Sequence, residues 1–126
     1  PKNHAPQRDV AQKAAKAAKK AGMEITDDPK KAATGADIIY TDSWMSYHVK
    51  EEEKKSRLKD FKPFQVTPEL MKLAKKDAIF MHCLPALRGE EVTSDVIDSK
   101  QSVVFTQAQN RLYLQQALLL KLLNKN

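Results

Sequence analysis

Three groups of polar side chains in the sequence carry functional groups that can do chemistry together. They are Asp42 with Ser46 and His48, His82 with Cys83, and Asn110 with Arg111. A carboxylate can hold an ammonium group, a thiol can orient a nucleophile, and a guanidinium binds oxyanions through its fork of donors. Each also has a plain structural interpretation: Asp42 as a turn cap, Cys83 as a small buried apolar residue, and Arg111 as half of a surface ion pair.

Each polar group follows a short apolar run that predicts a buried strand. The runs are 36–41, 78–81 and 102–105, with a further short strand predicted at 23–26. Helices are predicted at 8–21, 51–59, 93–97 and 107–123, and the first of them ends at Gly22. Two more helices are predicted to begin at Asp28-Pro29 and Thr67-Pro68, where an N-cap residue is followed by proline at the first helical position. This alternation predicts an α/β fold with a doubly wound parallel sheet. Ligands of such sheets bind beyond the carboxyl ends of the strands, so we expect the three groups to converge there.

Size and composition limit the classes of protein. The chain has 126 residues, 41% of them hydrophobic, with 22 Lys and Arg against 16 Asp and Glu, which is enough for one α/β domain. The sequence contains no apolar run of membrane-spanning length, and residues 1–6 show neither the hydrophobic core nor the cleavage site of a signal peptide. Its single cysteine favours a reducing compartment.

The net charge of +6 raises the question of nucleic-acid binding. The main lysine cluster is Lys13, Lys16, Lys19 and Lys20, opposite an apolar stripe formed by Val10, Ala14, Ala17, Ala18 and Ala21. This spacing predicts a helix with one narrow buried face and a solvated basic face. A nucleic-acid partner is therefore not expected, and neither is a membrane.

Several motifs together resemble one family. They are GADIIYTD at 35–42, EEEK and RLKDFKPFQV within 51–66, LMKLA at 70–74, FMHCLP at 80–85, RGEEVT at 88–93 and QNR at 109–111. The set is similar to the C-terminal, amino-acid-binding part of ornithine carbamoyltransferases and covers nearly all of the chain. The HCLP run with its downstream RGEEV is the most specific part.

The resemblance implies a Rossmann-like, partial C-terminal domain of a two-domain enzyme. Residues 1–106 would form the ornithine-binding domain without its first strand, and residues 107–126 a helix that packs towards the missing N-terminal, carbamoyl-phosphate domain. The implied reaction transfers the carbamoyl group of carbamoyl phosphate to L-ornithine, giving citrulline and phosphate, as in arginine biosynthesis. The resemblance further implies a homotrimer without metal or organic cofactor, in the cytoplasm or, in a eukaryote, the mitochondrial matrix.

The resemblance also assigns roles to residues. Asp42, Cys83 and Arg111 would be catalytic, with Arg111 contacting carbamoyl phosphate. The residues expected to bind substrate are these three together with Ser46, Tyr47, His82 and Leu84. His82 is expected to position its neighbours rather than act as a base, and the Leu84–Pro85 bond is expected to be cis.

Two departures from the family pattern keep other interpretations open. The acceptor loop reads Ser46-Tyr47-His48 where the family has Ser-Met-Gly, which leaves putrescine or an acylated ornithine as alternative acceptors. The Ser-Thr-Arg-Thr and His-Pro-x-Gln motifs of the family's N-terminal domain do not occur in the sequence, so we expect this chain alone to be inactive. A non-catalytic homologue or a basic binding module is the alternative from another class.

Overall fold

The computed structural model describes residues 1–45 and 49–123. Ser46, Tyr47 and His48 lie outside the described residues, so the predictions made for them stay predictions. The elements in chain order are η1 (Lys2–His4), α1 (Arg8–Ala18), η2 (Lys19–Ala21), α2 (Pro29–Ala33), β1 (Ile38–Thr41), α3 (Glu51–Phe61), η3 (Lys62–Phe64), α4 (Pro68–Met71), β2 (Ile79–His82), α5 (Ser94–Ile97) and α6 (Val104–Leu123).

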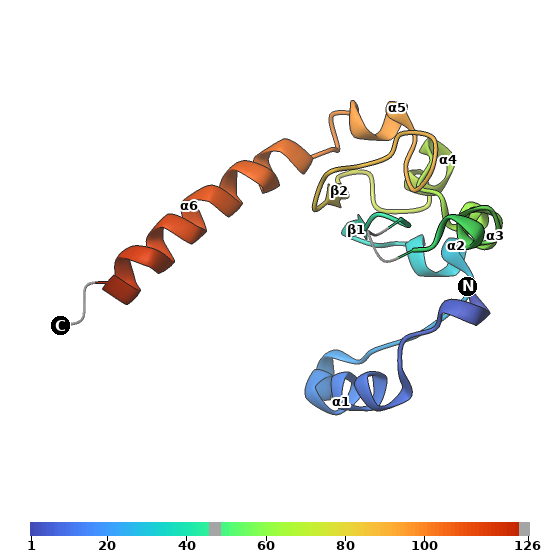
Figure 1. The fold of residues 1–126 in the computed structure, drawn as a ribbon, viewed down its shortest axis with the longest axis horizontal. Helices are drawn as coiled ribbons and strands as arrows, with labels where there is room; N and C mark the ends of the chain where they lie inside the picture. Colours follow the sequence, from blue (N-terminus) through green and yellow to red (C-terminus); the bar gives the residue numbers. More distant parts are fainter. Residues whose placement is uncertain (46–48, 124–126) are drawn as a thin grey trace.

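The N-terminal helix forms as predicted, but its apolar stripe is not buried. The helical segment ends at Gly22, whose φ of +75° lies in the region that glycine adopts without steric cost. No residue of α1 is buried, and Val10 is 52% exposed. The prediction of a buried stripe is therefore wrong for the described part of the chain, because α1 stands clear of the sheet (Figure 1).

The predicted strand at 23–26 is also wrong. These residues are irregular, and Ile25 is 54% exposed. An extended segment becomes a strand only when its backbone finds a ladder partner, and the described sheet offers residues 23–26 none. The next predicted element does form: the Asp28 carboxylate caps α2 by accepting hydrogen bonds from the backbone N–H groups of Lys30 and Lys31.

The sheet consists of β1 and β2, which pair in parallel. Their register runs from Ile38 opposite Ile79 to Thr41 opposite His82. The chain crosses from one strand to the other through α3 and α4, and the Thr67 side chain caps α4 by accepting the Leu70 N–H. Parallel neighbours joined through helices are the predicted α/β arrangement.

The third predicted strand is reduced to a single bridge between Ser102 and Phe80. The Phe80 N–H donates to the Gln101 carbonyl at 2.8 Å, and the Val103 N–H donates to the Phe80 carbonyl at 3.0 Å. The helix α6 then begins at Val104, so the predicted strand at 102–105 and the predicted helix start at 107 are both wrong. A short apolar run is compatible with a strand or with a buried helix end, and here Val104 enters the core as the latter.

The core lies between the sheet and the helices α4 and α5. It consists of buried side chains from Val66, Met71, Phe80, Val92, Val96, Ile97 and Val104. Beyond its first turn, α6 is exposed and runs out from this body as a single arm (Figure 1). No helix among the described residues has the length and apolar character needed to cross a membrane.

Candidate active site

The strand register brings Asp42 and Cys83 together. Thr41 and His82 are partners at the ends of β1 and β2, so the residues that follow them leave the sheet side by side. The Cys83 thiol donates a hydrogen bond to Oδ1 of Asp42, with 2.9 Å between Sγ and the oxygen. The same oxygen accepts the Ser43 N–H at 2.7 Å. The expected convergence at the carboxyl ends of the strands is confirmed for these two residues.

The two groups perturb each other's ionisation. The hydrogen bond from Cys83, followed by that from the Ser43 backbone, lowers the pKa of Asp42. The hydrogen bond to Asp42, together with burial and the negative charge of the carboxylate, raises the pKa of the Cys83 thiol. At neutral pH the pair is therefore a carboxylate beside a protonated thiol.

His82 and Glu91 brace the loop that carries Cys83, and both side chains are fully buried. The Leu84 N–H donates to Nδ1 of His82 at 2.8 Å, and the Leu87 N–H donates to Oε1 of Glu91 at 2.6 Å. Because Nδ1 accepts this hydrogen bond, a neutral His82 carries its proton on Nε2. Nε2 lies 3.3 Å from Oε1 of Glu91, and this contact is electrostatic rather than a well-directed hydrogen bond. These contacts are consistent with the positioning role predicted for His82.

The backbone of this loop has two special features. The Leu84–Pro85 peptide bond is cis, as expected. Leu84 has a φ of +57°, a conformation that leucine seldom adopts, and its N–H is held by His82. A positive φ at a residue other than glycine is uncommon, and such residues are concentrated at functional sites.

A cavity of about 650 Å³ opens beside the pair. Its lining includes Asp42, Cys83 and Leu84, which the sequence predicted, and Ser43, Met45, Val49, Lys54, Pro85 and Leu87, which it did not. Lys54 is the notable addition because its side chain lines the cavity while its ammonium pairs with Glu51. It lies in a run of charged residues in α3 that looks like an ordinary solvated helix face, so nothing in the sequence distinguishes it.

Arg111 does not join this site in the described structure. It is an exposed residue of α6, and the polar contacts described for Asp42 and Cys83 do not include it. What holds α6 to the sheet is its first turn, where Gln107 Oε1 accepts the His82 N–H at 3.1 Å and Gln107 Nε2 donates to the Tyr40 hydroxyl at 3.3 Å. The role predicted for Arg111 stays a prediction.

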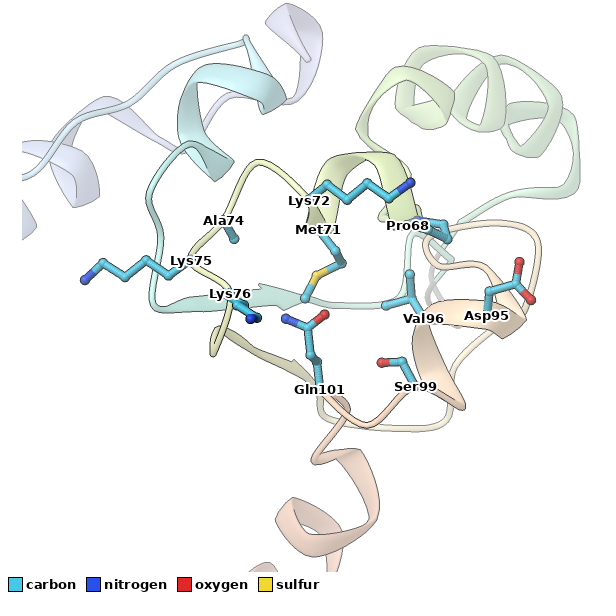
Figure 2. Close-up of a pocket in the computed structure, with 10 residues that line it drawn as sticks. All are labelled: Pro68, Met71, Lys72, Ala74, Lys75, Lys76, Asp95, Val96, Ser99 and Gln101. Atoms are coloured by element: carbon cyan, nitrogen blue, oxygen red, sulfur yellow. The ribbon is translucent and has the colours of Figure 1, made fainter.

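A second cavity, of about 410 Å³, lies between α4, α5 and the start of β2 (Figure 2). Lys72, Lys75 and Lys76 line one side of it, and Asp95 and Ser99 lie on the other. It shares no lining residue with the cavity at Asp42 and Cys83.

Within the described ranges, no group of three or more His, Cys, Asp or Glu side chains is arranged to hold a metal ion.

The fold and the site define a parallel α/β domain with a small-molecule cavity at the carboxyl ends of its strands, as in many enzymes that bind small substrates. Comparison with known proteins makes the family specific. The family model for aspartate/ornithine carbamoyltransferase, Asp/Orn binding domain, matches residues 1–122. The chain belongs to this family.

One similar protein is the ornithine carbamoyltransferase of Caldicellulosiruptor saccharolyticus, which is 52% identical over 94% of this chain and 39% of the relative. Another is the ornithine carbamoyltransferase of Archaeoglobus fulgidus, which is 50% identical over 99% of this chain and 40% of the relative. The solved ornithine carbamoyltransferase from Pyrococcus furiosus aligns with a TM-score of 0.84 at 52% identity, over 94% of this chain and 38% of the other. The chain thus spans about two fifths of the length of these relatives.

Proposed function

We propose that this chain forms the ornithine-binding part of an ornithine carbamoyltransferase. The neutral side-chain amine of L-ornithine attacks the carbonyl carbon of carbamoyl phosphate, the bond from that carbon to the phosphate oxygen breaks, and the proton that the nitrogen loses passes to the departing phosphate. The products are citrulline and phosphate, as in arginine biosynthesis. The observation that carries the proposal is the carboxylate and thiol held 2.9 Å apart at the mouth of a cavity in a domain of this family.

The chemical difficulty is that the attacking amine is normally protonated. An alkyl ammonium has a pKa near ~10.4, so about one molecule in a few thousand is neutral at pH 7, a deficit of roughly 4 to 5 kcal/mol. Asp42 supplies a carboxylate that stays ionised at neutral pH because its pKa is lowered. We assign it the role of holding the incoming ammonium where the proton is lost and the nitrogen lone pair faces the carbonyl carbon.

Cys83 orients the amine in this proposal. Its pKa is raised, so at neutral pH it is a thiol that donates to Asp42 and leaves its sulfur lone pairs to accept from the substrate amine. The neighbouring backbone, fixed by His82 at Leu84, presents carbonyl groups to the amino group of the carbamoyl moiety. Ser46 and Tyr47 are assigned to the amino-acid end of the acceptor.

Arg111 is assigned to carbamoyl phosphate. A guanidinium suits both the phosphate and the carbonyl oxygen, which gains negative charge as the tetrahedral centre forms. Binding carbamoyl phosphate also requires the remaining three fifths of the protein, and we propose that α6 packs against that part. We propose that the complete protein assembles as a homotrimer. Its proposed compartment is the cytoplasm or, in a eukaryote, the mitochondrial matrix.

Lys54 favours an acceptor that carries a carboxylate. Its side chain lines the cavity with Asp42 and Cys83, and its ammonium, which pairs with Glu51 at 2.5 Å, is the cation nearest at hand for a substrate carboxylate. Ornithine offers it a carboxylate, whereas putrescine offers only a second ammonium, which a lysine repels. This contrast supports ornithine over a diamine despite the unusual residues at 46–48.

The choice of acceptor is tested by initial rates of carbamoyl transfer by the complete protein. The rates are measured with ornithine, N-acetylornithine and putrescine at equal concentration. The expected order places ornithine at least tenfold above the other two. A preference for putrescine would overturn the choice of ornithine. In that case Lys54 has no carboxylate to bind, and a Lys54→Met variant would be expected to transfer the carbamoyl group to putrescine at the unchanged rate. Loss of transfer with all three acceptors would favour a non-catalytic homologue.

A further inference from the structure

A cluster of side chains around α3 connects the N-terminal turn η1 to the segment that carries Asp42. We call it the Arg57 cluster; its members are His4, Trp44, Arg57, Asp60 and Phe61. The His4 ring packs on the Phe61 ring with centroids 4.7 Å apart, and the Arg57 guanidinium lies 4.8 Å from the same ring. Trp44, only 5% exposed, packs on Phe61 with ring centroids 5.7 Å apart. Three segments distant in sequence are thereby held together.

The polar contacts of the cluster form a directed chain. Arg57 has only donors, so its NH1 donates to Nδ1 of His4, 3.4 Å away, and its Nε donates to the Trp44 carbonyl. With Nδ1 accepting, the His4 proton is on Nε2, which lies 3.3 Å from Asp60 Oδ2. This arrangement requires a neutral imidazole, because a protonated one has no lone pair to offer Arg57 and places a second cation beside it.

The chain of contacts continues to the candidate site. The Trp44 carbonyl belongs to a tight turn in which the Ser43 hydroxyl donates to the Met45 carbonyl at 2.8 Å. The Ser43 N–H of this turn donates to Oδ1 of Asp42, the oxygen that also accepts from Cys83. Fixing the Trp44 carbonyl from α3 therefore fixes the turn that aims Asp42.

We propose that His4 is a positioning residue for Asp42: its neutral imidazole holds Arg57 on the Trp44 carbonyl and so keeps the Asp42 carboxylate on the Cys83 thiol. As a role in carbamoyl transfer this rests on the proposed function. Loss of the contact between His4 and Arg57 frees the Trp44 carbonyl and loosens the turn. The charged side chains that line a cavity with His4 are Glu52, Glu53, Arg57 and Asp60.

The test measures how fast methyl methanethiosulfonate modifies Cys83 in the complete protein at pH 8, followed on the Cys83 peptide by mass spectrometry. His4→Phe keeps the ring packing and removes both polar contacts. His4→Gln keeps an acceptor and a donor and removes the ring. Thermal unfolding at pH 8 verifies that each variant is folded.

Loosening the turn frees the thiol from the carboxylate that raises its pKa, so modification accelerates. At pH 8, His4→Phe is expected to react about threefold faster than the wild type, because the contact it loses with Arg57 is long at 3.4 Å and therefore weak. His4→Gln is expected to react at the wild-type rate.

Arg57→Lys, which keeps the charge but loses the Nε donor, should reproduce His4→Phe. Equal rates for all variants would overturn the proposal. A wild-type rate in His4→Phe together with a faster rate in His4→Gln would also overturn it, because it would mean that His4 only packs. Thiol modification needs no substrate, so these outcomes are separate from the acceptor assay that tests the proposed function.

Discussion

Replacing Asp42 by Asn should make Cys83 more reactive. The carboxylate oxygen lies 2.9 Å from Sγ, and Asp42 is exposed, so a water-like dielectric applies. Two unit charges at that distance repel by about 1.4 kcal/mol in water, which suppresses the thiolate about tenfold at a given pH. Removing the charge restores that thiolate, but a thiolate of lower basicity is a weaker nucleophile, with a Brønsted coefficient of about 0.4 to 0.5. The net expectation is a rate of alkylation about three to four times that of the wild type.

Iodoacetamide alkylation of Cys83 at pH 8, followed by mass spectrometry, measures this rate. Asp37→Asn is the matched control, because Asp37 precedes the same strand and pairs with Lys75 at 2.6 Å, away from the thiol. It should leave the rate unchanged. An unchanged or slower rate in Asp42→Asn would refute the assignment of the raised thiol pKa to Asp42.

Three further predictions follow from single contacts. Glu91→Ala removes the acceptor of the Leu87 N–H at a fully buried site, so urea titration should show a loss of about 3 kcal/mol in the free energy of unfolding. Glu91→Gln keeps an acceptor oxygen and should lose less than half of that free energy. Asp28→Ala removes a cap that accepts two backbone N–H groups of α2 and should cost about 1 kcal/mol in the same assay. Leu118 and Leu122 are 52% and 60% exposed in α6, and replacing both by Lys should lower the thermal midpoint of the complete protein by several degrees if the rest of the protein covers them. An unchanged midpoint would contradict the packing proposed for α6.

Local patterns in the sequence predicted the parts of the site that depend on strand ends. Asp42 and Cys83 each follow a short apolar run, and parallel pairing brings such positions together whatever the details of the loops. Caps at Asp28 and Thr67 and the stop at Gly22 were equally predictable, because each is decided by a few neighbouring residues.

Features decided by long-range packing were not predictable. Val103 and Val104 look like strand residues, yet α6 begins at Val104, whose side chain is buried in the same core cluster as Phe80. Lys54 and Arg57 sit in a highly charged helix, and only the tertiary structure shows that one faces the cavity and the other holds the Trp44 carbonyl. Charge runs are usually solvated faces, so the pattern alone does not identify such residues.

Exposed apolar side chains are concentrated in the elements outside the core. Val10 in α1 and a series of leucines in α6 are more than half exposed, whereas the relatives are about two and a half times as long as this chain. Apolar surface of this extent normally marks an interface. We therefore expect the remainder of the protein to cover α6.

The most direct test of the account is the rate of citrulline formation by the complete protein with and without the Asp42 carboxylate. If this group holds the ornithine amine for attack, Asp42→Asn at saturating carbamoyl phosphate should lower kcat/KM for ornithine by a factor of about 100 or more, with Asp37→Asn unchanged. A kcat/KM for Asp42→Asn within threefold of the wild type would contradict the central claim.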